Sequence, residues 1–411
     1  MSAQETFVIV GAGLAGAKAA EALRAQDFGG KVVLIGDEND RPYDRPPLSK
    51  GYLLGKSERE EIYVHPPEWY AENDIDLRVG TRVVEIDRPD HAVKTQRGEE
   101  LRYDKLLLAT GSSPRHLRVP GAELGGVHYL RRVADSEGLR AAFDSAQRVA
   151  MIGAGWIGLE TAAAARAAGC HVTLIERSEL PLLTVLGPEV AATYADLHRN
   201  HGVDLRLDAE VIEIVGASSG VTGVSLADGV VQADAVVVGV GITPNTELAE
   251  AAGLPIDNGI VVDEHLATVD PDVFAAGDVA NAYYPTLDTH LRLEHWSAAL
   301  NQGPVAAANM IGKPVSYDRV PYFFSDQYDS GMEYTGYVDG GGYDTVVFRG
   351  DVAGGEFIAF WMRDGRVLAG MNVNVWDVTE AIEGLVRSGA QVDSAKLADP
   401  AAPWQELLSS K

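Results

Sequence analysis

Three glycines near the start of the chain have a spacing that suits the binding of a nucleotide pyrophosphate. Gly11, Gly13 and Gly16 follow the apolar run 7–10 and lead into residues 15–24, which have helical character. In such a turn Gly11 permits the tight bend, Gly13 lets the backbone approach a phosphate, and Gly16 allows the helix to pack closely on the strand. The free N–H groups of the first helical turn then face the phosphates. We therefore predict a buried parallel strand, a phosphate-binding turn and a helix here.

The same pattern occurs a second time. Gly153, Gly155 and Gly158 each stand 142 residues after their counterparts, and a predicted helix, 159–168, and strand, 171–175, follow them. Two dinucleotide-binding folds in one chain imply two dinucleotides. The repetition thus indicates that one cofactor binds to each fold and that the two are redox partners.

Acidic residues follow the second strand of each repeat. The strand predicted over 31–36 ends at Asp37 and Glu38, and the strand 171–175 ends at Glu176. A carboxylate in this place can bond ribose hydroxyls, and at Glu176 it would repel the 2′-phosphate of NADPH. Arg177 could instead partner that phosphate, but the acid holds the position that reads the ribose, so we predict a preference for NADH.

Composition bounds the remaining possibilities. The chain has 411 residues, of which 46% are hydrophobic and 44 are glycine, which favours an α/β protein of two or three domains. Lys and Arg number 34 against 60 Asp and Glu, a formal charge of −26 that disfavours nucleic acid as a partner. An acidic protein partner would need a local basic patch, for which Arg292 is a candidate beside the alternative of a solvated surface arginine.

The chain lacks several signals. No apolar run approaches the roughly 20 residues of a membrane span, and no signal peptide precedes the first strand, so we expect a cytoplasmic protein without a membrane partner. Cys170 is the one cysteine and has the setting of a buried structural residue. No Cys and His cluster has metal-ligand spacing, so we predict no metal site.

The rest of the chain alternates between sheet patterns. Residues 76–93 predict short strands of a small antiparallel sheet, and 103–111 and 233–244 each predict a strand that enters a tight turn. Residues 270–278 predict a strand that delivers Gly277 and Asp278 to a turn. Near the C-terminus, we predict antiparallel strands over 343–349, 357–362 and 366–373, a helix over 378–388, and a peripheral tail over 398–411.

Several stretches together resemble the flavoprotein pyridine-nucleotide oxidoreductases, and within them the NADH-dependent ferredoxin reductases of oxygenase and cytochrome P450 systems, the putidaredoxin reductase type. The resemblance covers nearly the whole chain. Its distinctive stretches are R-P-Y-D-R-P-P-L-S-K (Arg41–Lys50), L-L-L-A-T-G-S-S-P-R (Leu106–Arg115), the second glycine turn through Glu160, F-A-A-G-D (274–278) and E-H-W-S-A-A-L-N-Q-G (Glu294–Gly303).

The resemblance implies an architecture and two cofactors. Residues 1–115 and 246–325 would form a discontinuous FAD-binding domain, 116–245 an NADH-binding domain, and 326–411 a C-terminal α+β interface domain with an antiparallel sheet. NADH would pass a hydride to N5 of FAD, and a 2Fe-2S ferredoxin would then take single electrons in a transient complex. The chain itself would be a monomer or a homodimer.

The resemblance also assigns site residues. Lys50 would lie beside the flavin N5 and pair with Glu160, the pair taken as catalytic, and the helix after Trp296, residues 297–309, would direct its N-terminus toward the flavin. A surface Lys in a solvated pair is the alternative for Lys50. The residues predicted to bind the two cofactors are Gly11, Gly13, Leu14, Ala15, Gly16, Asp37, Arg45, Lys50, Thr110, Gly111, Arg132, Gly277, Asp278, Glu294, His295, Trp296, Gly153, Gly155, Trp156, Ile157, Gly158, Glu160, Glu176 and Gly241.

Departures from the family pattern leave alternatives open. Relatives often carry tryptophans in the stretch that here reads P-Y-F-F-S-D-Q-Y-D (321–329), so an aromatic electron route is not carried over, and Phe323 and Phe324 could instead cover the flavin ring. The cysteines of disulfide reductases and of flavin-thiol oxidases are absent after Arg41. Other acceptors (rubredoxin, a quinone, monodehydroascorbate or oxygen) remain alternatives, as does a redox-responsive binding protein resembling apoptosis-inducing factor.

Overall fold

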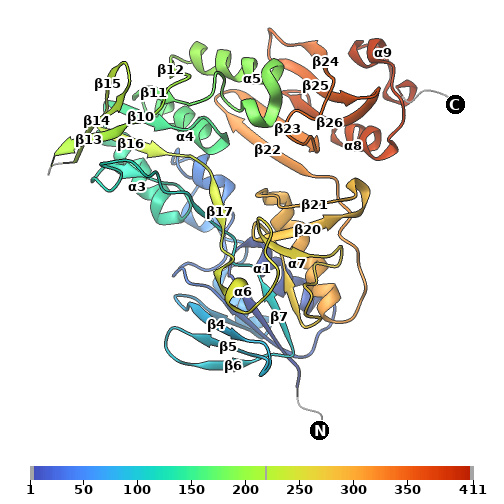
Figure 1. The fold of residues 1–411 in the computed structure, drawn as a ribbon. Helices are drawn as coiled ribbons and strands as arrows, with labels where there is room; N and C mark the ends of the chain where they lie inside the picture. Colours follow the sequence, from blue (N-terminus) through green and yellow to red (C-terminus); the bar gives the residue numbers. More distant parts are fainter. Residues whose placement is uncertain (1–3, 218–219, 408–411) are drawn as a thin grey trace. The chain divides into compact units, whose positions relative to one another are not determined.

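The computed structural model describes residues 4–217 and 220–407 and divides into two compact units. Unit 1 comprises Met1–Arg45, Glu58–Ser113 and Thr243–Pro321, and unit 2 comprises Pro46–Ser57, Pro114–Ile242 and Tyr322–Lys411. The chain passes from one unit to the other several times (Figure 1).

The centre of unit 1 is a five-stranded parallel sheet. Its strands, in spatial order, are β19 (Val273–Ala275), β7 (Lys105–Leu108), β1 (Thr6–Val10), β2 (Lys31–Ile35) and β3 (Ile75–Arg78). The central strands read T-F-V-I-V and K-V-V-L-I and are almost completely buried. Such continuous apolar runs are typical of parallel strands covered on both faces.

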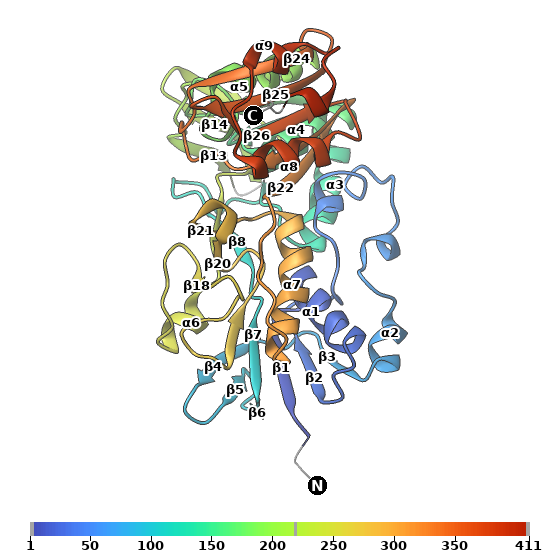
Figure 2. The ribbon, with the colours of Figure 1, turned by 90° about the vertical axis from the view of Figure 1, so that its right-hand side faces the viewer.

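Two helices lie side by side in unit 1, α1 (Leu14–Ala25) and α7 (Trp296–Met310) (Figures 1 and 2). They approach so closely that a Cβ atom added to Gly303 would lie 2.3 Å from the carbonyl oxygen of Ala15. The other elements of unit 1 are the α-helices α2 (Pro67–Glu72) and α6 (Glu247–Ala251), the 3-10 helices η2 (Arg59–Ile62) and η3 (Pro285–Leu287), the antiparallel sheet of β4 (Val83–Asp87), β5 (Ala92–Thr95) and β6 (Glu100–Arg102), and the sheet of β18 (Ile260–Val262), β20 (Ala280–Tyr284) and β21 (Thr289–Leu291).

Unit 2 repeats the parallel arrangement. Its sheet has the order β12 (Asp204–Arg206), β11 (His171–Ile175), β10 (Arg148–Ile152), β16 (Ala235–Val238) and β9 (Val127–His128). Further elements in this part of the chain are α3 (Val133–Ser145), α4 (Trp156–Ala167), α5 (Leu183–Asn200), η1 (Pro46–Ser49), and the antiparallel strands β13 (Glu213–Ala217), β14 (Gly220–Leu226) and β15 (Gly229–Gln232). The strands β8 (Ser112–Pro114) and β17 (Ile242–Pro244) stand where the chain leaves one unit for the other.

The C-terminal part of unit 2 is a five-stranded antiparallel sheet. Its order is β22 (Tyr322–Gln327), β23 (Ser330–Gly336), β26 (Arg366–Val373), β25 (Glu356–Arg363) and β24 (Thr345–Asp351), followed by α8 (Thr379–Ser388), α9 (Ser394–Ala398) and η4 (Trp404–Glu406). The sheet shares a core with the preceding helices, and the indole N–H of Trp361 donates to the carbonyl oxygen of Leu186 at 2.9 Å.

The predicted fold class is confirmed. Each unit contains one Rossmann-like parallel sheet, and unit 2 also contains the C-terminal antiparallel sheet. One strand assignment is wrong, because β3 pairs parallel with β2 rather than in the small antiparallel sheet predicted over 76–93. The predicted three domains stay a prediction. In the structure, residues 46–57 belong to unit 2, and so do 116–242 and 326–411.

The predicted peripheral tail is mostly exposed over its described part, 398–407, but it is bound to the antiparallel sheet. The Arg349 guanidinium on β24 donates hydrogen bonds to the carbonyl oxygens of Leu397, Asp399, Pro400 and Ala402, at distances between 2.5 and 3.3 Å. Leu407 is also buried in the core beside the antiparallel sheet. Residues 408–411 lie outside the described part of the chain.

Candidate functional site

The fold of unit 1 requires glycine at the first and the third position of its glycine turn. Gly11 has a φ of +118°, and a Cβ there would lie 2.0 Å from the carbonyl oxygen of Ala109. A Cβ on Gly16 would lie 2.0 Å from the carbonyl oxygen of Gly11. Above the middle glycine, Gly13, no described atom lies within 4 Å of the position a Cβ would take. Nothing in the described fold itself therefore demands a glycine at this position, whereas a ligand that approaches the backbone would.

The glycine turn of unit 2 has the same geometry. Gly153 has a φ of +97° and would place a Cβ 2.4 Å from the carbonyl oxygen of Gly239, and Gly158 would place one 2.0 Å from that of Gly153. Space beside Gly155 is again open among the described residues. Both turns thus fit a pyrophosphate, since each leaves its middle glycine uncovered at the start of a helix.

The helices that follow these turns begin without a side-chain cap. Gly13 is the N-cap residue of α1 and Gly155 that of α4, and a glycine has no side chain that could form a capping hydrogen bond. The first N–H groups of a helix have no partner within the helix, so they are available to an anion. The predicted residues Leu14, Ala15, Trp156 and Ile157 supply these first turns.

Glu176 lies at the carboxyl end of β11, where its side chain closes the glycine turn of unit 2. One carboxylate oxygen accepts the N–H of Ala154 at 2.7 Å, and the other accepts that of Ser178 at 2.9 Å. Arg177 is exposed and makes no hydrogen bond or ion pair with the rest of the described chain. The geometry holds the predicted ribose-binding carboxylate beside the turn and leaves the arginine outside it.

Unit 1 differs at the corresponding position. Gly11 donates to the carbonyl oxygen of Ile35 and Gly153 to that of Ile175, so the two turns superpose with Gly36, not Asp37, in the place of Glu176. Asp37 is one residue further along and is exposed. A Cβ on Gly36 would lie 2.6 Å from that of Ala12, which explains why this place holds no larger residue.

A polar cluster lies next to Asp37 and includes Glu38, the second of the two acids that follow β2. The Glu38 carboxylate accepts the hydroxyl of Tyr43 at 2.6 Å and the guanidinium of Arg45 at 3.0 Å. Burial opposes the charge of Arg45, but nearby Tyr43, Glu38 and Asp278 outweigh it and raise the pKa of the guanidinium. Arg45 is therefore fixed as a cation near Asp278, another predicted site residue.

The loop that follows β7 is tied down by two short segments. The Thr110 hydroxyl donates to the carbonyl oxygen of Asn245 at 2.7 Å, and the Asn245 amide donates to that of Thr110 at 2.8 Å. Gly111 has a φ of +67° and accepts the N–H of Asn245. Ser112 donates to Asp278 at 2.7 Å, so this loop and the turn with Gly277 form one cluster.

The start of α7 is fixed by its neighbours. The indole N–H of Trp296 donates to Asp44 at 2.7 Å, and His295 is the N-cap residue. Burial lowers the pKa of His295 to about 4, although the negative charge of Asp278 partly opposes that shift. His295 is accordingly neutral at neutral pH, which keeps a second positive charge away from this helix start.

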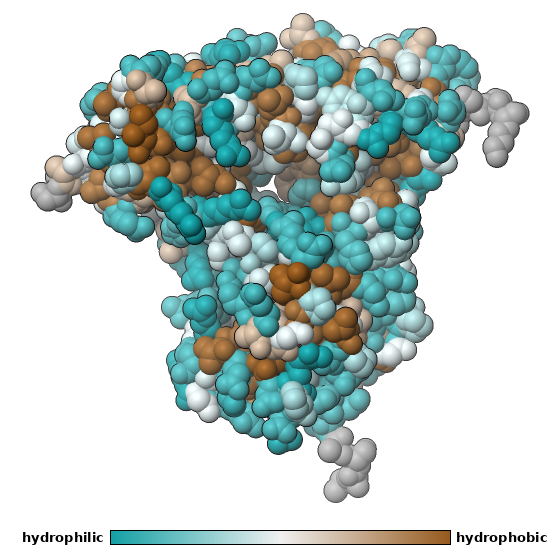
Figure 3. Space-filling view, viewed as in Figure 1, coloured by the Kyte–Doolittle hydropathy of each residue, from teal (hydrophilic) through white to brown (hydrophobic). Residues whose placement is uncertain are grey.

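Arg292, the candidate for a local basic patch, is neither an exposed patch residue nor a solvated surface arginine. Its side chain is only 7% exposed and forms an ion pair with Glu294 at 2.6 Å. An acidic partner cannot reach a buried, neutralised guanidinium. The largest exposed apolar side chain among the described residues is instead that of Trp376, 53% exposed on the loop after β26. On the face drawn in Figure 3, hydrophobic side chains occur in several separate groups among hydrophilic ones.

Unit 2 brings the two predicted catalytic residues together. The Lys50 ammonium lies 2.8 Å from a carboxylate oxygen of Glu160, which is 4% exposed on α4. The same nitrogen lies 5.5 Å from the ring centre of Phe324, in cation–π range. A segment rich in proline, 46–49, precedes Lys50 as the 3-10 helix η1, which restricts the backbone that presents this side chain.

Serine hydroxyls that the sequence did not point to complete the surroundings of Glu160. Ser49 donates to one carboxylate oxygen at 2.5 Å and Ser325 to the other at 2.6 Å. The one available sequence signal for Ser325 was its spacing from Gln327. The two residues are two positions apart in β22, and alternate residues of a strand lie on the same face. The aromatic ring of Phe323 meanwhile stacks on Tyr334 at 4.9 Å and contacts Trp156.

Two further predicted residues lie in unit 2. Arg132 is the exposed N-cap residue of α3, and its backbone N–H donates to Asp135 at 2.7 Å. Gly241 has a φ of +101° and accepts the N–H of Arg115 at 2.9 Å. Neither contact by itself identifies a ligand.

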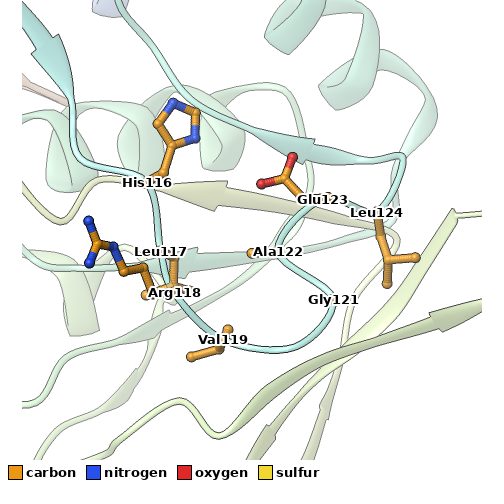
Figure 4. Close-up of a pocket in the computed structure, with 8 residues that line it drawn as sticks. All are labelled: His116, Leu117, Arg118, Val119, Gly121, Ala122, Glu123 and Leu124. Carbon is orange, nitrogen blue, oxygen red and sulfur yellow. The ribbon is translucent and has the colours of Figure 1, made fainter.

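Metal binding and membrane insertion find no support in the described residues. No group of three or more His, Cys, Asp or Glu side chains there could hold a metal ion. Of the helices that the structure describes, none has the length and apolar character needed to cross a membrane. An open surface hollow in unit 2 is lined by His116–Val119 and Gly121–Leu124 (Figure 4), and none of these is a predicted site residue.

The cysteine has the structural role expected of it. Cys170 is buried at the start of β11, and its thiol donates to the carbonyl oxygens of Phe143 and Ala146 at 3.4 Å. Burial raises the pKa of the thiol, which disfavours the reactive thiolate.

Comparison with known proteins places these features in a family. Residues 5–303 match the model of the family described as pyridine nucleotide-disulphide oxidoreductase, and residues 322–408 match the one described as reductase C-terminal. The first match alone spans well over half of the chain.

Individual relatives match along almost the entire length. The anthranilate 1,2-dioxygenase system ferredoxin–NAD(+) reductase component of Burkholderia cepacia is 45% identical over 98% of this chain and 99% of its own. Putidaredoxin reductase of Pseudomonas putida is 39% identical over 100% of this chain and 98% of its own. The reductase in the crystal structure of a covalent putidaredoxin reductase–putidaredoxin complex matches with a TM-score of 0.95, 38% identity and 99% coverage of both chains. The chain thus belongs to the pyridine nucleotide-disulphide oxidoreductase family.

Proposed function

We propose that this protein is an NADH-dependent ferredoxin reductase that carries FAD and delivers electrons to a 2Fe-2S ferredoxin of an oxygenase or cytochrome P450 system. The observation that carries the proposal is the pair of glycine turns, one in each unit, each with an uncovered middle glycine at an uncapped helix start. Relatives that match over nearly their full length and are ferredoxin–NAD(+) reductases support the same conclusion.

FAD would be held by residues of unit 1. Gly13 and the first N–H groups of α1 would receive its pyrophosphate, because they present unpaired donors at the positive end of a helix. Arg45 and Asp278 offer a fixed cation and a fixed anion in the same unit. Bound FAD supplies the conversion between a two-electron donor, NADH, and a one-electron acceptor.

NADH would be held by residues of unit 2. Gly155 and the start of α4 would bind its pyrophosphate, and Glu176 would accept hydrogen bonds from the adenine ribose. The carboxylate of Glu176 is already oriented by Ala154 and Ser178, so little rearrangement would accompany binding. A 2′-phosphate would meet this negative charge, which favours NADH over NADPH.

Lys50 and Glu160 would act through fixed charge rather than through proton transfer. Lys50 can stabilise negative charge that develops next to it, and Glu160 holds the ammonium group in one place. Preorganised charges of this kind need no reorganisation during the reaction. The single cysteine of the chain is buried, so the family's disulphide chemistry has no thiol pair here.

The acceptor decides between this proposal and its alternatives. Anaerobic titration of the FAD-loaded protein with NADH should bleach the flavin absorbance, and oxidised 2Fe-2S ferredoxin should restore it. Rubredoxin, a quinone, monodehydroascorbate and oxygen are tested in parallel. Restoration by one of these but by no ferredoxin would identify another acceptor class, and a reduced protein that no acceptor oxidises would favour a redox-responsive binding role.

A further inference from the structure

The carboxylate of Glu160 is the end point of a chain of buried hydrogen bonds within unit 2. Beyond the contacts with Lys50 and Ser49, its second oxygen accepts the hydroxyl of Ser325 at 2.6 Å. Ser325 in turn accepts the side-chain amide of Gln327 at 3.2 Å. Both residues are 2% exposed and lie on the same face of β22.

The chain continues to a histidine on a different helix. The Nε2 atom of His198, on α5, lies 2.9 Å from the amide oxygen of Gln327. Its Nδ1 atom lies 3.2 Å from the hydroxyl of Tyr328, in the turn between β22 and β23. His198 is fully buried and the bonds from Nε2 to Gln327, from Gln327 to Ser325 and from Ser325 to Glu160 are shielded from water, whereas Tyr328 is half-buried.

The donor and acceptor of each hydrogen bond can be assigned in order, starting from the carboxylate of Glu160. A carboxylate only accepts, so Ser325 donates to Glu160 and must accept from Gln327. The amide oxygen of Gln327 then accepts from Nε2–H of His198, which leaves Nδ1 to accept from the hydroxyl of Tyr328. Only one tautomer of a neutral histidine satisfies this order. Burial, which lowers the pKa of His198 to about 4, keeps the ring neutral.

We propose that Ser325, Gln327 and His198 are positioning residues that hold Glu160 in the orientation in which it pairs with Lys50. The proposal rests on the proposed function, because Lys50 matters only if it lies at the flavin. Each donor is fixed by the next one, and such one-way chains strengthen their members. Without Ser325, one oxygen of a carboxylate that is 4% exposed would lose its donor, and the side chain would be free to turn.

The test compares four variants of the full-length, FAD-loaded protein. Ser325→Ala removes the donor, Ser325→Thr keeps a hydroxyl, and Gln327→Leu breaks the chain at a residue that does not touch Glu160. Tyr343→Phe is the matched control, since it removes a hydroxyl that donates to the carboxylate of Glu189 at 2.9 Å in the same unit. The side-chain carboxyl carbons of glutamate are labelled with ¹³C, and the Glu160 resonance is assigned with Glu160→Gln.

Two measurements are made on each variant. Ser325→Ala and Gln327→Leu should both shift the Glu160 resonance and slow the limiting rate of flavin reduction by about three- to tenfold, the worth of one hydrogen bond. The NADH concentration at half-saturation should stay unchanged. Ser325→Thr should restore both properties, and Tyr343→Phe should alter neither.

The outcomes separate this proposal from the proposed function. An unshifted Glu160 resonance in both Ser325→Ala and Gln327→Leu would overturn the positioning chain, even if NADH reduces the wild-type flavin rapidly. A shifted resonance with an unchanged rate would overturn the functional role of the chain. If NADH does not reduce the flavin of the wild-type protein, the proposed function itself is overturned. This result does not depend on any variant.

Discussion

Glu176 carries the nucleotide preference at the scale of single residues. Its two carboxylate oxygens accept backbone N–H groups of the glycine turn and of Ser178. Glu176→Gln keeps an acceptor for Ala154 but removes the charge that opposes a 2′-phosphate. We expect the ratio of kcat/KM for NADH to that for NADPH to fall by about 10- to 100-fold, equal to roughly 1.4–3 kcal/mol.

Steady-state kinetics with both nucleotides measures this ratio. Glu179→Gln, a charge removal at an exposed neighbour, serves as the control and should leave the ratio close to that of the wild type. An equally large drop in Glu179→Gln would mean that net charge, not the position of Glu176, sets the preference.

Lys50 and Glu160 form a coupled pair. Removing one partner leaves the other charge in a largely buried place, since the two side chains are 16% and 4% exposed. Lys50→Met and Glu160→Gln should each lower the free energy of unfolding, and the double variant should lose less than the sum. We expect a coupling free energy of about 1–3 kcal/mol from denaturant unfolding. Losses that simply add would contradict a direct interaction.

His198 makes stability depend on pH. Burial is the largest cause of its lowered pKa of about 4, the positive charge of a protonated His201 adds to the shift, and the hydrogen bond to Gln327 opposes it. The unfolded chain, with an ordinary histidine pKa near 6.5, therefore takes up the proton first as the pH falls. The stability due to neutral His198 is present above about pH 6.5 and decreases by about 3 kcal/mol toward pH 4.

Unfolding free energies measured between pH 7 and pH 4 test this expectation. His198→Gln should show a shallower loss of stability than the wild type over that interval, whereas His171→Gln, at an exposed position, should follow the wild-type curve. Parallel curves for the wild type and His198→Gln would show that His198 does not titrate in this way.

Single site residues could be predicted from the sequence where a motif fixes the backbone, but not where tertiary contacts bring distant residues together. The glycine spacing indicated both turns, and the order of strand and acid indicated Glu176. Asp37 was chosen by the same reasoning, although the superposed position holds Gly36. Ser325, Gln327 and His198 carry no local pattern, because they meet only when β22 packs beside α4 and α5.

Among the elements, the contact between α1 and α7 depends on a small residue. A Cβ on Gly303 would lie 2.3 Å from a backbone oxygen of α1, whereas one on Gly138, an exposed position in α3, would meet no described atom within 4 Å. Gly303→Ala should thus destabilise the protein by about 1–3 kcal/mol through overpacking. Gly138→Ala should stabilise it by about 0.5–1 kcal/mol, because alanine favours the helix.

Thermal unfolding of both variants decides the matter, since the same substitution should move the melting temperature in opposite directions. Two shifts of the same sign would mean that the helix contact relaxes around the added methyl group or that glycine at position 138 has a further role.

Element-scale prediction was accurate for strands and helices with strong apolar patterns. The predicted strand 171–175 is the observed β11, and the predicted helix 378–388 differs from α8 by one residue. Strand pairing was harder to predict than strand position. β3 pairs parallel with β2, but its short sequence pattern contains nothing that specifies a parallel neighbour. The anchoring of the tail was not predictable, since Arg349, which binds it, lies about 50 residues away in sequence.

The whole molecule has two glycine turns of the same geometry, one in each unit, and we propose that each unit binds one dinucleotide. The formal charge is −26, and Arg292 is buried and paired with Glu294, so this arginine does not attract an acidic partner. The sequence predicted the cofactors through repeated motifs, but a docking surface has no comparable motif.

The most direct test of the central claim is anaerobic stopped-flow spectroscopy with sequential mixing. The FAD-loaded protein is mixed first with NADH and then, after the flavin has bleached, with oxidised 2Fe-2S ferredoxin from an oxygenase or cytochrome P450 system. We expect rapid bleaching, followed by rapid ferredoxin reduction as the flavin absorbance returns. Bleaching without electron transfer to any ferredoxin of the panel would contradict the claim, and failure of NADH to bleach the flavin would contradict it at its first step.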